Sequence, residues 1–227
     1  MNQAFALKVM ALYAQIDQLT DTFLVTTQLH CPSGCGWCCT SPDVEATPLE
    51  MLPIAFELFR RGEGEVWIER TTREQEIKTC LFYQPNPLIP DQGRCQAYAM
   101  RPTICRLFGW STATNKSGQP ELIACTRHKA LMPEVVACVA AAIANGLEAP
   151  NMAALSQQVA NLDPELGRQR MPINQALRVA LFRVGLELQL TGDSHARTAA
   201  DSGQRPTALP ITAISCTKRS NRSGVKD

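Results

Sequence analysis

The sequence lacks an excess of charge of either sign, and it lacks a long hydrophobic run. Its 227 residues carry 22 Lys and Arg against 21 Asp and Glu, which leaves a formal net charge of +1. Such a balance gives no general attraction for nucleic acids. The longest apolar candidate, Val135 to Ala144, is far shorter than the roughly 18 to 20 residues of a membrane helix. We therefore expect no nucleic-acid partner and no membrane span.

A recognisable export signal is also missing. The basic residue nearest the N-terminus, Lys8, lies inside the first apolar stretch rather than ahead of it, and polar residues at helical spacing interrupt that stretch. We therefore expect a cytoplasmic protein in a reducing compartment. In that setting, clustered cysteines are more often metal ligands than disulfide partners.

Familiar catalytic patterns are missing as well. The sequence shows no Ser-His-Asp arrangement, phosphate-binding loop, dinucleotide fingerprint or internal repeat. The carboxylates near the first cysteines, Asp43, Glu45 and Glu50, are as well explained by turns and helix caps as by catalysis. The sequence therefore predicts no substrate site, and it identifies no particular protein partner.

Cysteine is the residue type that the sequence has in unusual number and placement. Eight of its ten cysteines fall between residues 31 and 125, whereas Cys138 and Cys216 stand apart. The eight are Cys31, Cys35, Cys38, Cys39, Cys80, Cys95, Cys105 and Cys125. The neighbours Cys38 and Cys39 could bridge each other only with strain, which disfavours a disulfide framework. The pattern predicts one metal-binding module.

Thiolates are ligands for zinc, copper(I) and iron–sulfur clusters. Cys31-x3-Cys35-x2-Cys38-Cys39 supplies four of them within nine residues, and the second half of the module supplies four more. Two arrangements remain open, namely two four-coordinate zinc ions or one iron–sulfur cluster with spare cysteines. His30 and His128 flank Cys31 and Cys125 and could replace a thiolate, although the cysteines suffice without them.

Eight thiolates around two zinc ions leave a net negative charge, so hydrogen-bond donors are expected beside the sulfurs. Arg94, Arg101, Arg106 and Arg127 all lie within one or a few residues of second-half cysteines. Each could equally be an ordinary surface arginine. We place Arg101 and Arg106 beside the bound cofactor.

Elsewhere the sequence is mainly helical. Six apolar residues at intervals of three and four predict a core-facing helix at the N-terminus: Phe5, Val9, Leu12, Ile16, Leu19 and Phe23. Thr47-Pro48-Leu49-Glu50 predicts a capped helix that ends near Gly62, and a more polar helix is expected over 63–79. Helical patterns return after Thr126 and end at Thr191. Asn115 to Gly118 separates two stretches that favour a small hairpin.

The expected fold is therefore mainly α, with a small irregular, metal-organised cysteine module and one short β-hairpin. The predicted segments are an amphipathic helix over 1–30, the cysteine-cluster domain over 31–130, C-terminal helices over 131–191 and a disordered basic tail over 192–227. The tail prediction rests on six basic against three acidic residues and on the loss of apolar periodicity.

These motifs resemble the YkgJ-like cysteine-cluster family, whose domain is described as chelating zinc or iron. The similarity covers about residues 31 to 130. It rests on the first four cysteines, on Cys80 and on the run Cys95-x2-Tyr98-x2-Arg101-Pro102-x2-Cys105-Arg106-x-Phe108. The resemblance implies metal chelation, with Tyr98, Arg101 and Pro102 shaping the site rather than binding the metal.

A second class of function is kept as the alternative. A related cysteine-rich segment occurs in flagellin lysine N-methylases, and Cys31-x3-Cys35-x2-Cys38 also has the spacing of radical S-adenosylmethionine enzymes. Those radical enzymes use repeated strand–helix units, which this sequence does not show. The alternative is therefore an iron–sulfur enzyme that performs redox or methyl-transfer chemistry.

Overall fold

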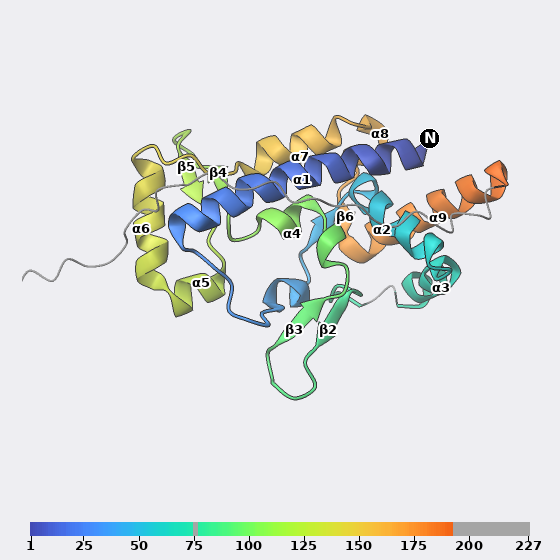
Figure 1. The fold of residues 1–227 in the computed structure, drawn as a ribbon, viewed down its shortest axis with the longest axis horizontal. Coiled ribbons are helices and arrows are strands. Elements are labelled where there is room, and N and C mark those ends of the chain that lie inside the picture. Colours follow the sequence, from blue (N-terminus) through green and yellow to red (C-terminus); the bar gives the residue numbers. More distant parts are fainter. Residues whose placement is uncertain (75–76, 193–227) are drawn as a thin grey trace, which may run out of the picture.

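A computed structural model describes residues 1–74 and 77–192, and within this part the chain is mainly helical (Figure 1). The helices are α1 (Asn2–Thr27), α2 (Pro48–Arg60), α3 (Gly64–Arg73), α4 (Thr103–Leu107), α5 (Thr126–Leu131), α6 (Pro133–Ala144), α7 (Met152–Ala160), α8 (Pro164–Gly167) and α9 (Ile173–Thr191). Short 3-10 turns span Trp37–Thr40 and Tyr98–Met100. The expected mainly α fold is confirmed. The predicted tail lies outside the described residues, apart from Gly192.

In the described part of the chain, three two-stranded antiparallel sheets join the helices. β4 (Thr112–Thr114) pairs with β5 (Pro120–Leu122), which confirms the predicted hairpin. Two further pairs were not expected, namely β2 (Tyr83–Pro85) with β3 (Gly93–Cys95), and β1 (Glu45–Ala46) with β6 (Met171–Pro172). The β1–β6 pair ties the segment after the first cysteines to the start of α9.

The main core forms where α2 packs against both α1 and α9. Its fully buried members include Val9, Leu49, Leu52, Leu177 and Leu181. A smaller apolar cluster, with Phe23, Leu29, Trp110, Val139 and Ile143, lies between the end of α1 and α6. Both cores draw on segments distant in sequence, so the cysteine segment is bracketed by helices from both ends of the chain.

The N-terminal helix is present, but its buried face differs from the expected stripe. Val9, Ile16 and Phe23 are buried as predicted, whereas Leu19 is exposed and Phe5 and Leu12 are only partly buried. Tyr13 and Thr20 take the buried positions instead. Their hydroxyls find hydrogen-bond acceptors there: Tyr13 donates to the carbonyl of Glu50, and Thr20 to that of Ile16. A hydrophobic count cannot anticipate such satisfied polar groups.

The capping box of α2 is confirmed, because the Thr47 hydroxyl accepts from the amide of Glu50 while the Glu50 carboxylate accepts from the amide of Thr47. The polar helix expected over 63–79 is shorter and ends at Arg73. The helical pattern after Thr126 breaks at Pro133, where α5 gives way to α6. None of the helices in the described part of the chain is long and apolar enough to cross a membrane.

Candidate metal centre

The cysteine segment is assembled by backbone hydrogen bonds between stretches distant in sequence. The amide of Gly93 donates to the carbonyl of Gly34 at 2.9 Å, and the amide of Cys80 donates to the carbonyl of Cys39 at 3.1 Å. Cys35 also forms a bridge with Gln92. These contacts hold the first group of cysteines against the β2–β3 hairpin and against Cys80.

Two glycines make this approach possible. A Cβ atom added at Gly36 or at Gly93 would collide with the ring of Tyr83. The ring lies across both glycines, and its hydroxyl donates to the carbonyl of Gln92. The glycines of the first motif and of β3 are therefore packing requirements, in addition to being helix breakers.

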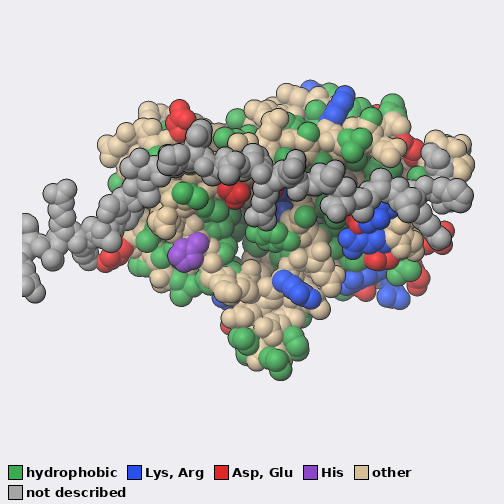
Figure 2. Space-filling model, viewed as in Figure 1, with side chains coloured by type: hydrophobic (Ala, Val, Ile, Leu, Met, Phe, Trp, Pro, Cys, Tyr) green, Lys and Arg blue, Asp and Glu red, His purple; other side chains and the backbone are tan. Residues whose placement is uncertain are grey.

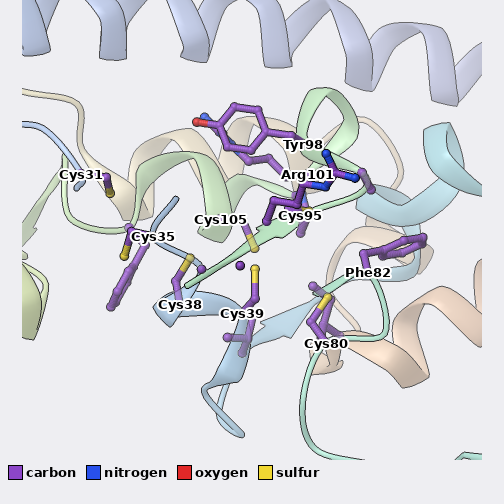
Figure 3. A pocket seen from close by; sticks show the side chains of 18 of the residues that line it. Cys31, Cys35, Cys38, Cys39, Cys80, Phe82, Cys95, Tyr98, Arg101 and Cys105 are labelled. Atoms are coloured by element: carbon purple, nitrogen blue, oxygen red, sulfur yellow. The ribbon is translucent and has the colours of Figure 1, made fainter. Parts of the chain in front are cut away.

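Seven of the eight clustered cysteines line one cavity of about 400 Å³. They are Cys31, Cys35, Cys38, Cys39, Cys80, Cys95 and Cys105. The sulfurs of Cys38, Cys39 and Cys105 point toward one another, whereas Cys31 and Cys35 lie to one side (Figure 3). Cys125 does not line the cavity, although its thiol is near enough to Cys31 to affect the pKa of the Cys31 thiol.

Cys39 is the hub of the central group. Its thiol makes side-chain hydrogen bonds with Cys38 and with Cys95. These bonds lower the pKa of the Cys38 and Cys95 thiols and raise that of Cys39. Burial, followed by the charges of Cys80 and Cys38, raises the pKa of Cys105. The central cysteines are therefore close enough to affect one another's pKa values.

Cys31 has different neighbours. Burial, followed by Cys35, Cys38 and Cys125, raises the pKa of its thiol to about 12. Its sulfur also lies 3.7 Å from Nε2 of His128, within hydrogen-bond reach of a thiol. His128 is buried, whereas His30, the other histidine considered from the sequence, is exposed and bonds the carbonyl of Gln28.

The donor set fits a soft metal. The cavity wall carries seven thiols, and no carboxylate is among its lining residues in the described part of the chain. Thiolates of this kind suit zinc or an iron–sulfur cluster. Within residues 1–74 and 77–192, no three Cys, His, Asp or Glu side chains are already placed around one point as ligands of an ion. Cys39 is instead hydrogen-bonded to Cys38 and Cys95, and Cys31 to His128.

Tyr98 and Arg101 both line the cavity. The Arg101 guanidinium stacks over the Tyr98 ring at 3.8 Å from its centroid, and Tyr98 is 65% exposed. Arg101 also lies 4.0 Å from Asp17 of α1. Its Nε atom is buried and has no hydrogen-bond partner among the described residues. The pair forms one wall of the cavity mouth.

Arg106 is placed differently. It does not line the cavity and is only 1% exposed. Its guanidinium bonds Asp17 and the carbonyl of Ala99, donates to the carbonyl of Arg101 at 2.8 Å and covers the ring of Tyr13. The structure thus puts Arg106 between α1 and the turn that carries Tyr98. Of the other two arginines, Arg94 lines the cavity and bonds Gln84, while Arg127 stacks on Trp37.

Two positioning residues were missed by sequence reasoning. The Asn174 side chain accepts from the amide of Leu81 and donates to the carbonyls of Ile77 and Thr79, so α9 clamps the residues around Cys80. Glu50 accepts from the amide of Thr103 at 3.0 Å and thereby caps α4, which carries Cys105. The capping box indicated Glu50 as a cap of α2 only, and no sequence signal marks Asn174.

Comparison with protein-family models matches residues 30–134 to the CxxCxxCC family, described as a putative zinc- or iron-chelating domain. This range contains all eight clustered cysteines, with Tyr98, Arg101 and Arg106. Searches of curated proteins and of solved structures gave no match. Residues 30–134 are therefore similar to the CxxCxxCC zinc- or iron-chelating domain, in agreement with the cysteine-cluster resemblance of the sequence motifs.

Proposed function

We propose that the clustered cysteines bind zinc or an iron–sulfur cluster as thiolates, and that the bound metal holds the segment between residues 31 and 125 in its folded form. One observation carries the proposal. Seven cysteines from separate stretches of the chain meet in a single cavity although little regular structure connects them. Because such sites do not exist in the unfolded chain, metal-binding energy adds directly to folding energy.

The metal would be held mainly by the central group, where Cys38, Cys39 and Cys105 already face one another (Figure 3). A bound metal ion or cluster would accept thiolate charge that is costly to bury alone. The Arg101 guanidinium at the cavity wall is placed to offset the remaining negative charge. Asn174 and Glu50 would keep Cys80 and Cys105 in position.

The test compares metal content in variants of the chain. We expect Cys39→Ser and Cys105→Ser to lose bound metal and to melt at lower temperature than the parent, because each removes a central thiolate. Ser117→Ala is the control, since Ser117 is exposed in the turn between β4 and β5 outside the cavity lining, and its metal content should not change. Unchanged metal content and melting temperature in both cavity variants would contradict the proposal.

A second candidate function is an iron–sulfur enzyme of redox or methyl-transfer type. The observation in its favour is the cavity mouth, where exposed Tyr98 offers an aromatic surface and Arg101 a buried, unpartnered Nε–H within the described residues. These groups would suit a small cofactor that carries both an aromatic ring and a carboxylate, such as S-adenosylmethionine. Anaerobic equilibrium dialysis with S-adenosylmethionine tests it. Binding that Arg101→Met abolishes would favour the enzyme, whereas a closed zinc shell without binding would exclude it.

A further inference from the structure

The eight clustered cysteines fall into two neighbourhoods. Cys39 bonds both Cys38 and Cys95, its sulfur points toward that of Cys105, and its carbonyl accepts from the amide of Cys80, so we assign these five to an inner group. Cys31 lies instead beside His128, 3.7 Å from its Nε2 atom, and both His128 and Cys125 adjoin Gly109. Figure 3 shows Cys31 and Cys35 apart from the converging inner sulfurs. An outer group of three thiols and one imidazole follows.

His128 is an unusual member of this outer group because it is buried without full hydrogen bonding. The residue is 1% exposed, and its Nδ1 atom has no partner among the residues that the structure describes. The imidazole is held in place by the Trp110 ring, at a centroid distance of 4.7 Å, and by Gly109. A Cβ at Gly109 would lie 2.9 Å from the imidazole Cε1. The Nε2 atom of this fixed ring faces the Cys31 sulfur and is therefore the ring atom placed to bind a metal.

The backbone presents the four side chains in two short-spaced pairs. Cys125 precedes α5 as its N-cap and His128 follows three residues later, a spacing that puts two side chains on one helix face. Cys31 and Cys35 lie on an irregular segment that includes Gly34 in a left-handed conformation with φ 70°. Two such pairs, supplying three thiolates and one imidazole, make a standard donor set for structural zinc.

We propose that His128 is a metal ligand, and that with Cys31, Cys35 and Cys125 it forms a zinc site separate from the inner cysteines. The inference rests on the proposed metal-binding function and adds a second site with a nitrogen ligand. The Cys31 sulfur and the His128 Nε2 atom lie 3.7 Å apart, a separation at which both could bind the same zinc ion. Cys38 stays with the inner group, because its thiol bonds Cys39 and its sulfur points toward Cys39 and Cys105.

The experiment measures zinc per chain in the full-length protein, purified with zinc in the medium, and in three variants. We expect His128→Ala to lose one zinc equivalent relative to the parent and to keep its helical circular dichroism. His128→Cys should restore that equivalent, because a thiolate can replace the imidazole. His30→Ala is the matched control, since His30 adjoins Cys31 but is exposed, and it should bind as much zinc as the parent.

X-ray absorption of the zinc-loaded parent keeps the proposal falsifiable even if a variant fails to fold. A mixed sulfur and imidazole shell is expected, and an all-sulfur shell would overturn the inference. So would full zinc content in His128→Ala, or a parent that binds only one ion or one cluster. Each of these results leaves the metal-binding function standing, whereas a parent that binds no metal would refute the function itself.

Discussion

The helical frame and the cysteine segment of this protein are held together by different means. In the frame, α1, α2 and α9 bury whole apolar side chains such as Ile16, Leu52 and Leu181 against each other. Between residues 31 and 45, by contrast, Gly36 is the only buried residue. Apolar burial, at about 25 cal/mol per Å², therefore stabilises the frame far more than the first cysteine motif. The difference supports the proposal that bonds between thiolates and a metal stabilise the cysteine segment, where apolar packing contributes little.

The two regions also present different surfaces. The β2–β3 hairpin projects from the body below the cysteine segment, and apolar side chains gather at its tip (Figure 2). Leu88 and Ile89 are exposed there. On the frame, charged residues cover the solvent side of α2 and α3, as in the ion pairs of Glu57 with Arg60 and Arg61. The cysteine segment thus relies on neither a large core nor surface ion pairs.

Metal removal should give the largest difference in stability between the helical frame and the cysteine segment. With a chelator under reducing conditions, we expect amide hydrogen exchange to rise by orders of magnitude over 31–46 and 80–105, because metal-binding energy is lost there. The buried parts of α1, α2 and α9 should retain slow exchange. Mass spectrometry of peptides from each region measures this directly. Equal loss of protection in both regions would mean that the frame, too, depends on metal.

Arg106 connects the two regions, so its replacement should give the next largest effect. Arg106→Met removes the guanidinium from Asp17 and from the carbonyls of Ala99 and Arg101. We expect a loss of about 2–3 kcal/mol in the free energy of unfolding, measured by urea denaturation, because buried carbonyls lose a charged donor while Asp17 stays hydrated. Arg106→Lys keeps the positive charge but lacks the planar guanidinium, so its free energy of unfolding should lie between those of the parent and of Arg106→Met. A variant as stable as the parent would show that this junction is unimportant.

Asn174 makes the second junction and should have a smaller effect. Asn174→Ala removes three hydrogen bonds to residues 77–81 and should cost about 1–2 kcal/mol. Metal should also leave the protein faster on addition of a chelator, because Cys80 is less well positioned. Asn161→Ala, which breaks an exposed bond with Gln157 on α7, is the control. Equal metal-release rates in the two variants would argue against positioning by Asn174.

The surface ion pairs of the frame should contribute least. Hydrogen bonds from Arg60 and Arg61 outweigh partial burial, which acts in the opposite direction, and lower the pKa of Glu57 to about 2. A lowered folded-state pKa gives stability that is present above the unfolded value of about 4.3 and is lost as pH falls toward 2. Since both arginines are well exposed, solvent limits the effect to about 0.5–1 kcal/mol.

The measurement for this pair is urea unfolding of Glu57→Gln and of the parent as a function of pH. The two proteins should differ at pH 7, and the difference should shrink as pH is lowered below about 4. A difference that does not depend on pH would mean that the carboxylate charge is not its source.

The sequence predicted those parts of the fold whose causes are local. The capping box at Thr47 and Glu50, the hairpin around Asn115 and the apolar stripe of α9 each depend on residues a few positions apart. The β2–β3 pair was missed because Pro85, Pro87 and Pro90 favour extended loop, while the pairing depends on packing of Tyr83 against Gly36 and Gly93. Contacts between residues this far apart in the sequence cannot be predicted from the local pattern of apolar residues.

At the candidate site, too, sequence reasoning found residues close together in the chain and missed contacts between distant ones. Spacing alone identified the cysteines, seven of which meet in one cavity, and the family resemblance indicated Tyr98 and Arg101, which line the same cavity. Arg106 was expected beside the sulfurs because it follows Cys105. Consecutive residues of a helix point about 100° apart, however, so α4 directs Cys105 into the cavity and Arg106 toward α1. Asn174 lies far from the cysteines in sequence and could be found only from the fold.

The most direct test of the central claim is the metal and acid-labile sulfide content of the full-length protein, purified anaerobically without a metal-affinity tag, together with its visible absorption spectrum. The account predicts stoichiometric metal: either zinc in a colourless protein, or iron and sulfide in similar amounts in a brown one. Protein that contains neither metal, yet shows the cysteine segment protected from hydrogen exchange, would contradict it.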